Sequence, residues 1–100
     1  MIRDWPEISR REDRIYVTLP VTLRTGWGGA TVVNGNTVDY SERGLRVRTN
    51  VLFRIREDVE AVISDNPNFG GNYSVKWVRE LVPGQFLFEA GLAIQQDRPV

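Results

Sequence analysis

Apolar and polar residues alternate along most of this chain with the two-residue period of half-buried β-strands. The clearest run covers residues 15–23, where every odd residue from Ile15 to Leu23 is apolar and the even ones are Tyr, Thr or Pro. Pro20 lacks a backbone N–H, so we expect it at a sheet edge or a bulge. The run predicts one strand with a single buried face.

Further strands follow along the chain. Residues 30–40 are rich in β-forming residues, and Asn34-Gly35 within them is either a two-residue hairpin turn or a bulge in one long strand, of which we favour the bulge. For residues 51–62 we expect a loop followed by a strand, because the segment contains β-branched residues and lies between strands. Other alternating sets are Leu45, Val47 and Thr49; Val59, Ala61 and Ile63; Tyr73, Val75 and Trp77; and Phe86, Phe88, Ala90, Leu92 and Ile94. Six short strands separated by turns predict an all-β barrel or sandwich.

The composition narrows the class of protein. One hundred residues fit one small domain. The longest uncharged stretch, 25–38, is too short and polar to span a membrane, and the N-terminal residues show no signal-peptide pattern. No cysteine is present, which excludes a disulfide framework. We therefore expect a soluble, cytoplasmic protein without a membrane span.

The charged residues exclude some functions. The formal net charge is zero, so the basic field of a general DNA or RNA binder is missing. Of the 13 basic residues only Lys76 is not arginine. This bias favours planar, bidentate recognition, although a GC-rich genome explains it equally well. The absence of histidine and cysteine removes the usual nucleophile pairs and zinc sites. We expect neither an enzyme nor a cofactor.

Two polar clusters stand apart from the alternating strands. In SRREDR, residues 9–14, Arg10 and Arg14 are four apart and could form a two-armed guanidinium clamp for phosphate or guanine, with Arg11 as a third arm. Considered by itself, this spacing is better explained by local pairing with the neighbouring acidic residues.

The second cluster is Asp39-x-Ser41-x-x-Gly44. Asp39 and Ser41 are two apart at a strand end and should project from one face, where the carboxylate would suit the N–H groups of a guanine. Gly44 could adopt a positive φ or let a ligand approach the backbone. When the cluster is considered alone, ordinary turn chemistry, with both side chains capping backbone amides and Gly44 closing the reversal, is the better explanation.

Together the clusters resemble the signature of the PilZ domain family of receptors for cyclic di-GMP, a bacterial second messenger. The flanking segments RIYVTLPVTLR, VDYSERGLRVRT, YSVKWV and FLFEAGLAI are similar to the family's strands, so the resemblance covers residues 10–94. It implies a six-stranded antiparallel β-barrel over 10–94, with tails at 1–9 and 95–100. Many members carry a helix after the last strand, but this chain continues there with QQDRPV, so we expect little or no C-terminal helix. Glu57-Asp58 also replaces a glycine often found before the fourth strand.

The resemblance also implies a ligand site on the outside of the barrel. Arg10, Arg11 and Arg14 would grip phosphates and guanine edges, Asp39 and Ser41 would hydrogen-bond guanine, and Gly44 would keep the surface open. The implied function is a signalling receptor that changes a protein-interaction surface when cyclic di-GMP binds. The alternative is a PilZ-like adaptor that binds a protein partner and no nucleotide.

The remaining aromatic and basic side chains need no function at this stage. Trp77, Phe86 and Phe88 fit core positions. Trp27, in a Gly-rich loop, is either a partner anchor or, more commonly for such a residue, packed down on the barrel. Arg46 and Arg48 share the face opposite the core and are expected to be solvated, with Arg46 within possible reach of a ligand.

Overall fold

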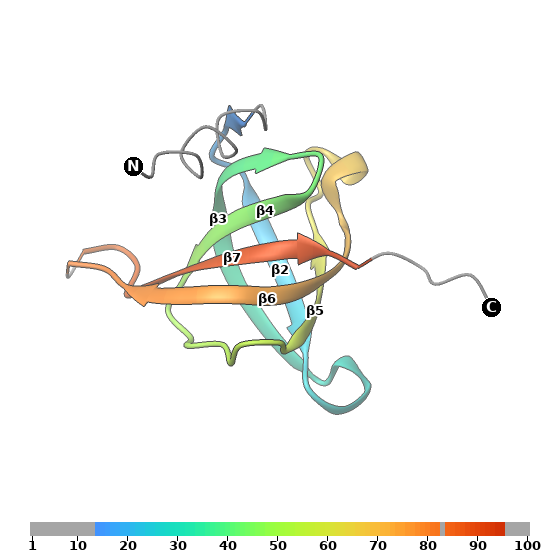
Figure 1. The fold of residues 1–100 in the computed structure, drawn as a ribbon, viewed down its shortest axis with the longest axis vertical. Helices are drawn as coiled ribbons and strands as arrows, with labels where there is room; N and C mark the ends of the chain where they lie inside the picture. Colours follow the sequence, from blue (N-terminus) through green and yellow to red (C-terminus); the bar gives the residue numbers. More distant parts are fainter. Residues whose placement is uncertain (1–13, 83, 96–100) are drawn as a thin grey trace, which may run out of the picture.

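Seven antiparallel strands and two short 3-10 turns form the regular structure of residues 14–82 and 84–95, the part of the chain that the computed structural model describes (Figure 1). The strand order is β1-β3-β2-β5-β6-β7-β4, and β4 pairs back with β3 to close a six-stranded barrel. The extra strand, β1, lies on β3. The bounds are β1 Ile15–Tyr16, β2 Pro20–Thr25, η1 Trp27–Gly29, β3 Thr31–Ser41, β4 Gly44–Thr49, β5 Asp58–Val62, η2 Pro67–Phe69, β6 Gly71–Glu80 and β7 Phe88–Ile94.

The all-β, six-stranded antiparallel barrel expected from the sequence is confirmed. The described residues contain no α-helix. No helix in the described ranges has the length and apolar character needed to cross a membrane.

The barrel interior is filled mainly by the alternating aliphatic residues that the sequence pattern selected. The buried apolar set is Val21, Leu23, Val33, Leu45, Val47, Phe53, Val59, Ala61, Ile63, Tyr73, Val75, Ala90 and Leu92. Val33 and Phe53 are the two members that the alternating sets did not include. Phe53 lies in the loop between β4 and β5. Glu57 anchors this loop by accepting hydrogen bonds from the Thr25 hydroxyl and the Arg54 amide.

The run at residues 15–23 is two strands, not the single strand predicted. The Thr37 hydroxyl interrupts it, because it accepts a hydrogen bond from the Leu19 amide at 2.8 Å and donates one to the Val17 carbonyl. Ile15 in β1 is consequently 52% exposed. Pro20 is the first residue of β2, a position where a missing N–H is tolerated.

A register shift in β3 turns its end toward the outside of the barrel. Residues 31–41 form one long strand as expected, but the bulge is at Val38, between Thr37 and Asp39, and not at Asn34-Gly35. Before the shift, Thr37 lies opposite the core residue Val47; after it, Asp39 lies opposite Arg46. Because side chains alternate along a strand, one extra residue places Asp39 and Ser41 on the outer face.

A second register shift, in β6, has the same effect on a tryptophan. It lies between Val75 and Trp77, so Val75 faces the core and Trp77 faces outward with 39% of its surface exposed. The prediction that Trp77 belongs to the core is therefore wrong, and Val78 packs against the core in its place. The bulge at residue 76 changes the phase of the alternation, which no local sequence pattern revealed.

The other aromatic predictions also need correction. Phe86 and Phe88 are half-buried and are not members of the core cluster. Trp27 does not pack on the barrel, because 96% of its surface is exposed. It lies on the 3-10 turn η1, in and before which Gly26, Gly28 and Gly29 have positive φ.

Gly44 is required by close strand packing. Its φ is not in the positive region, contrary to one of the sequence expectations. A Cβ at this position would lie 2.2 Å from the Leu92 carbonyl oxygen of β7, so the backbones of β4 and β7 approach too closely for any side chain.

We predict that Gly44→Ala lowers the free energy of unfolding by about 1–3 kcal/mol, because β7 must shift to admit the methyl group. Gly84→Ala is the matched control, since its added Cβ would meet nothing closer than 3.7 Å, and it should change stability by no more than about 0.5 kcal/mol. Urea unfolding of the three proteins measures both effects. Equal stability of the two variants would contradict this role of Gly44.

Candidate functional site

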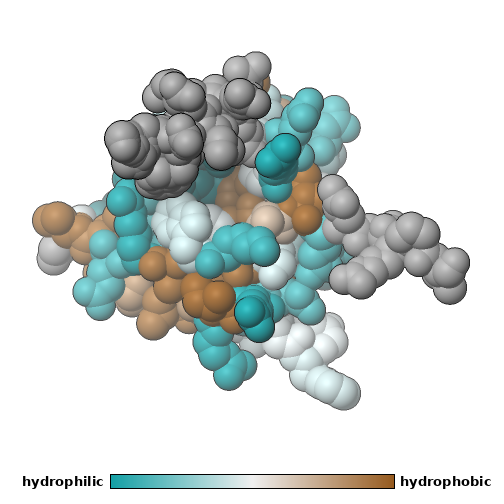
Figure 2. All heavy atoms as spheres, in the orientation of Figure 1, coloured by the Kyte–Doolittle hydropathy of each residue, from teal (hydrophilic) through white to brown (hydrophobic). Residues whose placement is uncertain are grey.

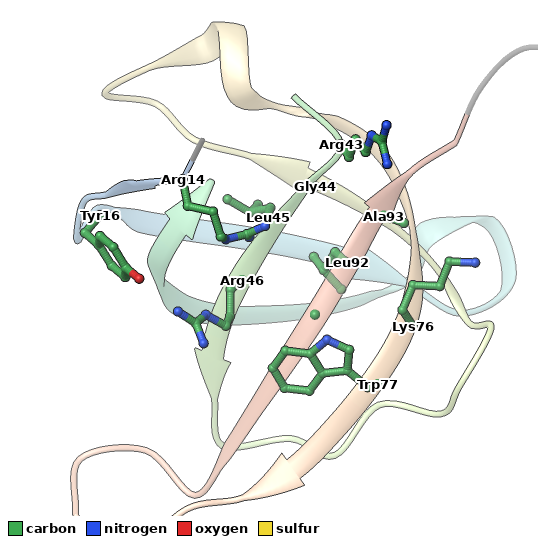
Figure 3. Close-up of a pocket in the computed structure, with 11 residues that line it drawn as sticks. Arg14, Tyr16, Arg43, Gly44, Leu45, Arg46, Lys76, Trp77, Leu92 and Ala93 are labelled. Carbon is green, nitrogen blue, oxygen red and sulfur yellow. The ribbon is translucent and has the colours of Figure 1, made fainter. Parts of the chain in front are cut away.

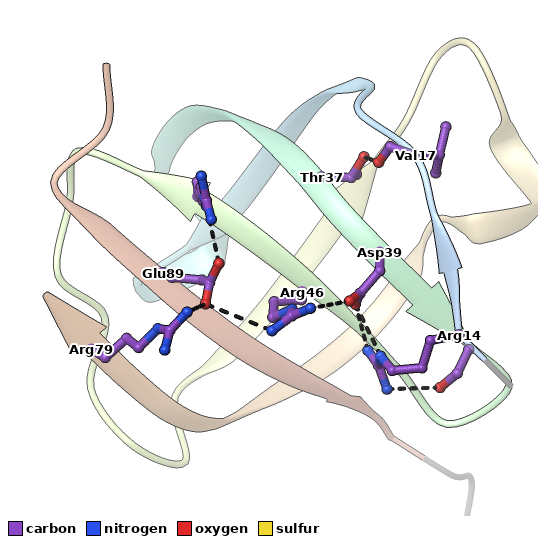
Figure 4. Close-up of polar contacts among 9 residues, drawn as sticks. Arg14, Val17, Thr37, Asp39, Arg46, Arg79 and Glu89 are labelled. Carbon is purple, nitrogen blue, oxygen red and sulfur yellow. Dashed lines mark hydrogen bonds and ion pairs between the residues drawn. The ribbon is translucent and has the colours of Figure 1, made fainter. Parts of the chain in front are cut away.

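The carboxylate of Asp39 is the centre of the outer-face site. Arg14, just before β1, donates to Asp39 Oδ1 from Nε at 3.0 Å and from Nη2 at 2.8 Å. Arg46 on β4 donates from Nη2 to Oδ2. The Asp39 side chain is 0% exposed although it lies on the outer face, because the two guanidinium groups cover it (Figure 4).

Ser41 joins the same group of contacts. Its Oγ accepts a hydrogen bond from Arg14 Nη1 at 3.3 Å and another from the Arg43 backbone amide at 3.2 Å. The second bond is the turn chemistry considered from the sequence, and the first links the turn to Arg14. Residues 39 and 41 therefore act on one face, as their spacing predicted.

The pairing determines the protonation state of Asp39. Burial by itself would raise the pKa of this carboxyl, but the hydrogen bonds and positive charges of Arg14 and Arg46 outweigh burial and lower the pKa below its usual value. Asp39 is consequently an anion at neutral pH and holds both arginines in place.

A second buried carboxylate continues the network. Glu89 on β7 has a side chain that is 0% exposed, and it pairs with Arg79 at 2.7 Å and with Arg48 at 3.0 Å. Arg46 Nη1 lies 3.9 Å from Glu89 Oε1, so Arg46 stands between the two carboxylates (Figure 4). Arg46 and Arg48 are thus paired, which corrects the expectation that they are merely solvated.

Beside this network lies an open pocket of about 450 Å³ on the outside of the barrel. Figure 3 shows Arg14 and Arg46 on one side of it and Lys76 and Trp77 on the other. The lining residues are Arg14, Tyr16, Arg43, Gly44, Leu45, Arg46, Lys76, Trp77, Gly91, Leu92 and Ala93. Four of them are cations and none is an acid, while the surface over β4, β6 and β7 carries both hydrophilic and apolar side chains (Figure 2).

Trp77 owes its place in the pocket to a glycine on the neighbouring strand. Gly91 is paired with Trp77 across β6 and β7. A Cβ at Gly91 would lie 2.2 Å from Trp77 Nε1, so the indole occupies the space of the missing side chain. The ring is thereby held against β7 and remains partly exposed to the pocket.

This arrangement suits an anionic ligand with a flat ring. Guanidinium groups bind phosphate or a guanine edge through paired hydrogen bonds, and an exposed indole offers a surface for a base to stack on. No group of three or more metal-binding side chains is found in the part of the chain that the structure describes.

The structure brings together four of the six site residues predicted from the sequence. Arg14, Asp39 and Ser41 are in direct contact, and Gly44 lines the same pocket as Arg14. Arg10 and Arg11 lie outside the described residues. Sequence reasoning missed Arg43, Lys76, Trp77 and Glu89. Of these four, only Glu89 had a signal in the sequence, because the alternation of residues 86–94 places it on the face opposite the core; its arginine partners follow only from the strand order.

Comparison with known proteins gives a family match. The model of the PilZ domain family matches residues 8–99, nearly the whole chain. The match includes every strand of the barrel and all residues of the pocket. No curated protein matches this chain.

The lowered pKa of Asp39 predicts a pH-dependent contribution to stability. A carboxyl whose folded pKa is depressed stabilises the fold above its unfolded pKa, and this contribution is lost as the pH falls through the folded value. We expect Asp39→Asn to lower the free energy of unfolding by about 1–3 kcal/mol at pH 7, and we expect the difference from wild type to shrink below about pH 4.

Unfolding measured at pH 7 and pH 3 tests this prediction. Glu42→Gln, in the exposed β3–β4 turn, is the control and should leave stability unchanged within about 0.5 kcal/mol at pH 7. A difference between Asp39→Asn and wild type that is as large at pH 3 as at pH 7 would show that the charge of Asp39 is not what stabilises the fold.

Proposed function

The chain belongs to the PilZ domain family, and on this basis we propose that it binds cyclic di-GMP in the outer-face pocket and acts as a signalling receptor. PilZ domains are receptor or adaptor domains, and the family is generally linked to this nucleotide. One observation supports the proposal above all. The pocket combines four cations with an exposed indole, directly beside the Asp39 and Ser41 pair.

The cations match the charge and edges of the ligand. Cyclic di-GMP carries two phosphodiesters, each with one negative charge, and two guanines whose O6 and N7 atoms accept hydrogen bonds. Arg14, Arg46 and Lys76 line the pocket and provide N–H donors for these groups. In this proposal Arg10 and Arg11 add further contacts from the segment before Arg14.

Trp77 is the stacking surface for a guanine. Its ring lines the pocket and is held against β7 at Gly91. Base–aromatic stacking contributes about 1–3 kcal/mol per base. This role replaces the core position that the sequence pattern suggested for Trp77.

Asp39 has two roles that depend on Arg14. Its carboxylate forms ion pairs with Arg14 and Arg46, which cover it, and these pairs orient both arginines beside the pocket. It can accept an N–H from guanine only when Arg14 turns away, for instance toward a phosphate. Ligand binding then rearranges the segment around Arg14, which changes the surface available to a protein partner.

The energetics are adequate for a receptor. Hydrogen bonds to charged groups contribute about 1.5–3 kcal/mol each. Four or five of these, together with stacking, leave about −8 kcal/mol after the cost of association, which corresponds to micromolar affinity.

Calorimetric titration with cyclic di-GMP tests the proposal directly. We expect saturable binding with a Kd of about 1 μM. GMP, which has one guanine and lacks the cyclic pair of phosphodiesters, should bind much more weakly. Absence of heat and of any thermal shift up to high micromolar ligand, with folded protein, would exclude the receptor function and favour a nucleotide-independent adaptor.

We further predict that Arg14→Ala weakens binding of cyclic di-GMP by at least about 1.5 kcal/mol, since it removes donors from the pocket. Circular dichroism of the variant checks that the barrel is intact. Arg24→Ala is a suitable control, because Arg24 is an exposed arginine on β2 that does not line this pocket. Equal losses in the two variants would point to a general charge effect in place of a specific contact.

Two exposed tryptophans among the described residues provide a matched comparison. Trp77→Ala should weaken binding by about 1–3 kcal/mol through loss of stacking. Trp27→Ala removes an even more exposed indole from a loop outside the pocket and should leave the affinity unchanged. The same calorimetric titration measures both, and an effect of Trp27 equal to that of Trp77 would place the ligand elsewhere.

A further inference from the structure

Glu89 occupies an unusual position for a carboxylate. The strand pairings place it opposite Arg48 of β4 and Arg79 of β6, on the outer face of the barrel. Its side chain is nevertheless fully covered. It is not among the residues that line the pocket, so it has no assigned part in ligand contact.

Two of the arginines around Glu89 connect it to the pocket, Arg46 as a lining residue and Arg79 through its contact with Trp77. Arg46 lines the pocket itself, and its Nη1 lies 3.9 Å from Glu89 Oε1. Arg79 pairs with the same oxygen at 2.7 Å, and its guanidinium carbon lies 6.0 Å from the centre of the Trp77 ring, within the range of a cation–π contact. The carboxylate of Glu89 therefore contacts the cationic lining residue Arg46 and, through Arg79, supports the aromatic lining residue Trp77.

We propose that Glu89 is a positioning residue for the ligand pocket, which orients Arg46 directly and Trp77 through Arg79. This inference rests on the proposed function, because it assigns Glu89 a role in that same site. Arg46 lines the pocket, and its long side chain loses rotational freedom when a ligand immobilises it. Because Glu89 holds Arg46, and through Arg79 also Trp77, before the ligand arrives, less of the ordering cost falls on binding.

The charge of Glu89 and its positioning role should have opposite effects on ligand affinity, which makes the inference testable. Its negative charge lies near a site for an anionic ligand, so by long-range electrostatics its removal should strengthen binding. If Glu89 acts by positioning, its removal should weaken binding. The two roles thus predict changes of opposite sign in the same measurement.

The test compares Glu89→Gln with Glu80→Gln in calorimetric titrations with cyclic di-GMP. Both variants remove one negative charge from the β6–β7 hairpin, but Glu80 is exposed and does not line the pocket. We expect Glu89→Gln to weaken binding about tenfold, whereas Glu80→Gln should leave the affinity within about twofold of wild type or slightly improve it. Unchanged or tighter binding by folded Glu89→Gln would overturn the inference.

A second readout does not require the ligand. The NMR signal of the Trp77 indole N–H in the free protein should shift in Glu89→Gln, because Arg79 loses its ion pair, and should stay in place in Glu80→Gln. If wild type fails to bind cyclic di-GMP, the proposed function is wrong, and the indole signal still decides whether Glu89 orients Trp77. No shift in folded Glu89→Gln would overturn this part of the inference.

Arg79→Gln keeps the test decisive if Glu89→Gln does not fold. The Arg79 side chain is 57% exposed, so its replacement spares the core. It should move the Trp77 indole signal and weaken binding about threefold, since Arg46 keeps its contacts. An unchanged indole signal together with unchanged affinity would show that Arg79 does not transmit the position of Glu89 to Trp77.

Discussion

The outer-face site depends on the ion pairs that Asp39 makes with Arg14 and Arg46. A carboxylate that is fully covered is unstable unless its charge is paired and its oxygens are hydrogen-bonded. Both conditions are met here by guanidinium groups from two different parts of the chain. Arg14 precedes β1 and Arg46 lies on β4, so satisfying Asp39 attaches the start of the described chain to the barrel. The cationic wall of the pocket follows from this requirement.

A β-bulge in each of two strands turns side chains of the site to the outside of the barrel. One register shift in β3 turns Asp39 and Ser41 outward, and another in β6 turns Trp77 outward. In each case the residues before the shift continue to fill the core. The bulges thus allow one strand to contribute both to stability and to a surface site, without breaking the closed ladder of the barrel.

The sequence was informative where alternation is regular and uninformative where it shifts. The alternation of Leu45 and Val47 with arginines predicted β4 correctly, because no bulge interrupts that strand. Trp77 was misassigned because an extra residue changes the inward and outward phase, and a bulge leaves no distinct mark in composition. The prediction that Asp39 and Ser41 share one face is correct because both residues follow the bulge in β3.

The long-range pairs could not be derived from the chain alone. Glu89 is 41 residues from Arg48, with which it pairs, and only the order of strands β4, β7 and β6 reveals that three arginines surround it. The resemblance to a known family compensated for part of this gap, because it identified Arg14 and Asp39 as partners in one site although 25 residues separate them.

The most direct test of the account follows the tryptophan indole signals by NMR during titration of the protein with cyclic di-GMP. The chain has three tryptophans, and Trp77 and Trp27 are the two in the described structure. If the nucleotide binds in the outer-face pocket, the Trp77 indole N–H signal shifts and saturates with the ligand while the Trp27 signal stays in place. A saturable shift of Trp27 with an unchanged Trp77 signal would contradict the account, because the nucleotide would then bind outside the pocket that Asp39, Arg14 and Arg46 organise.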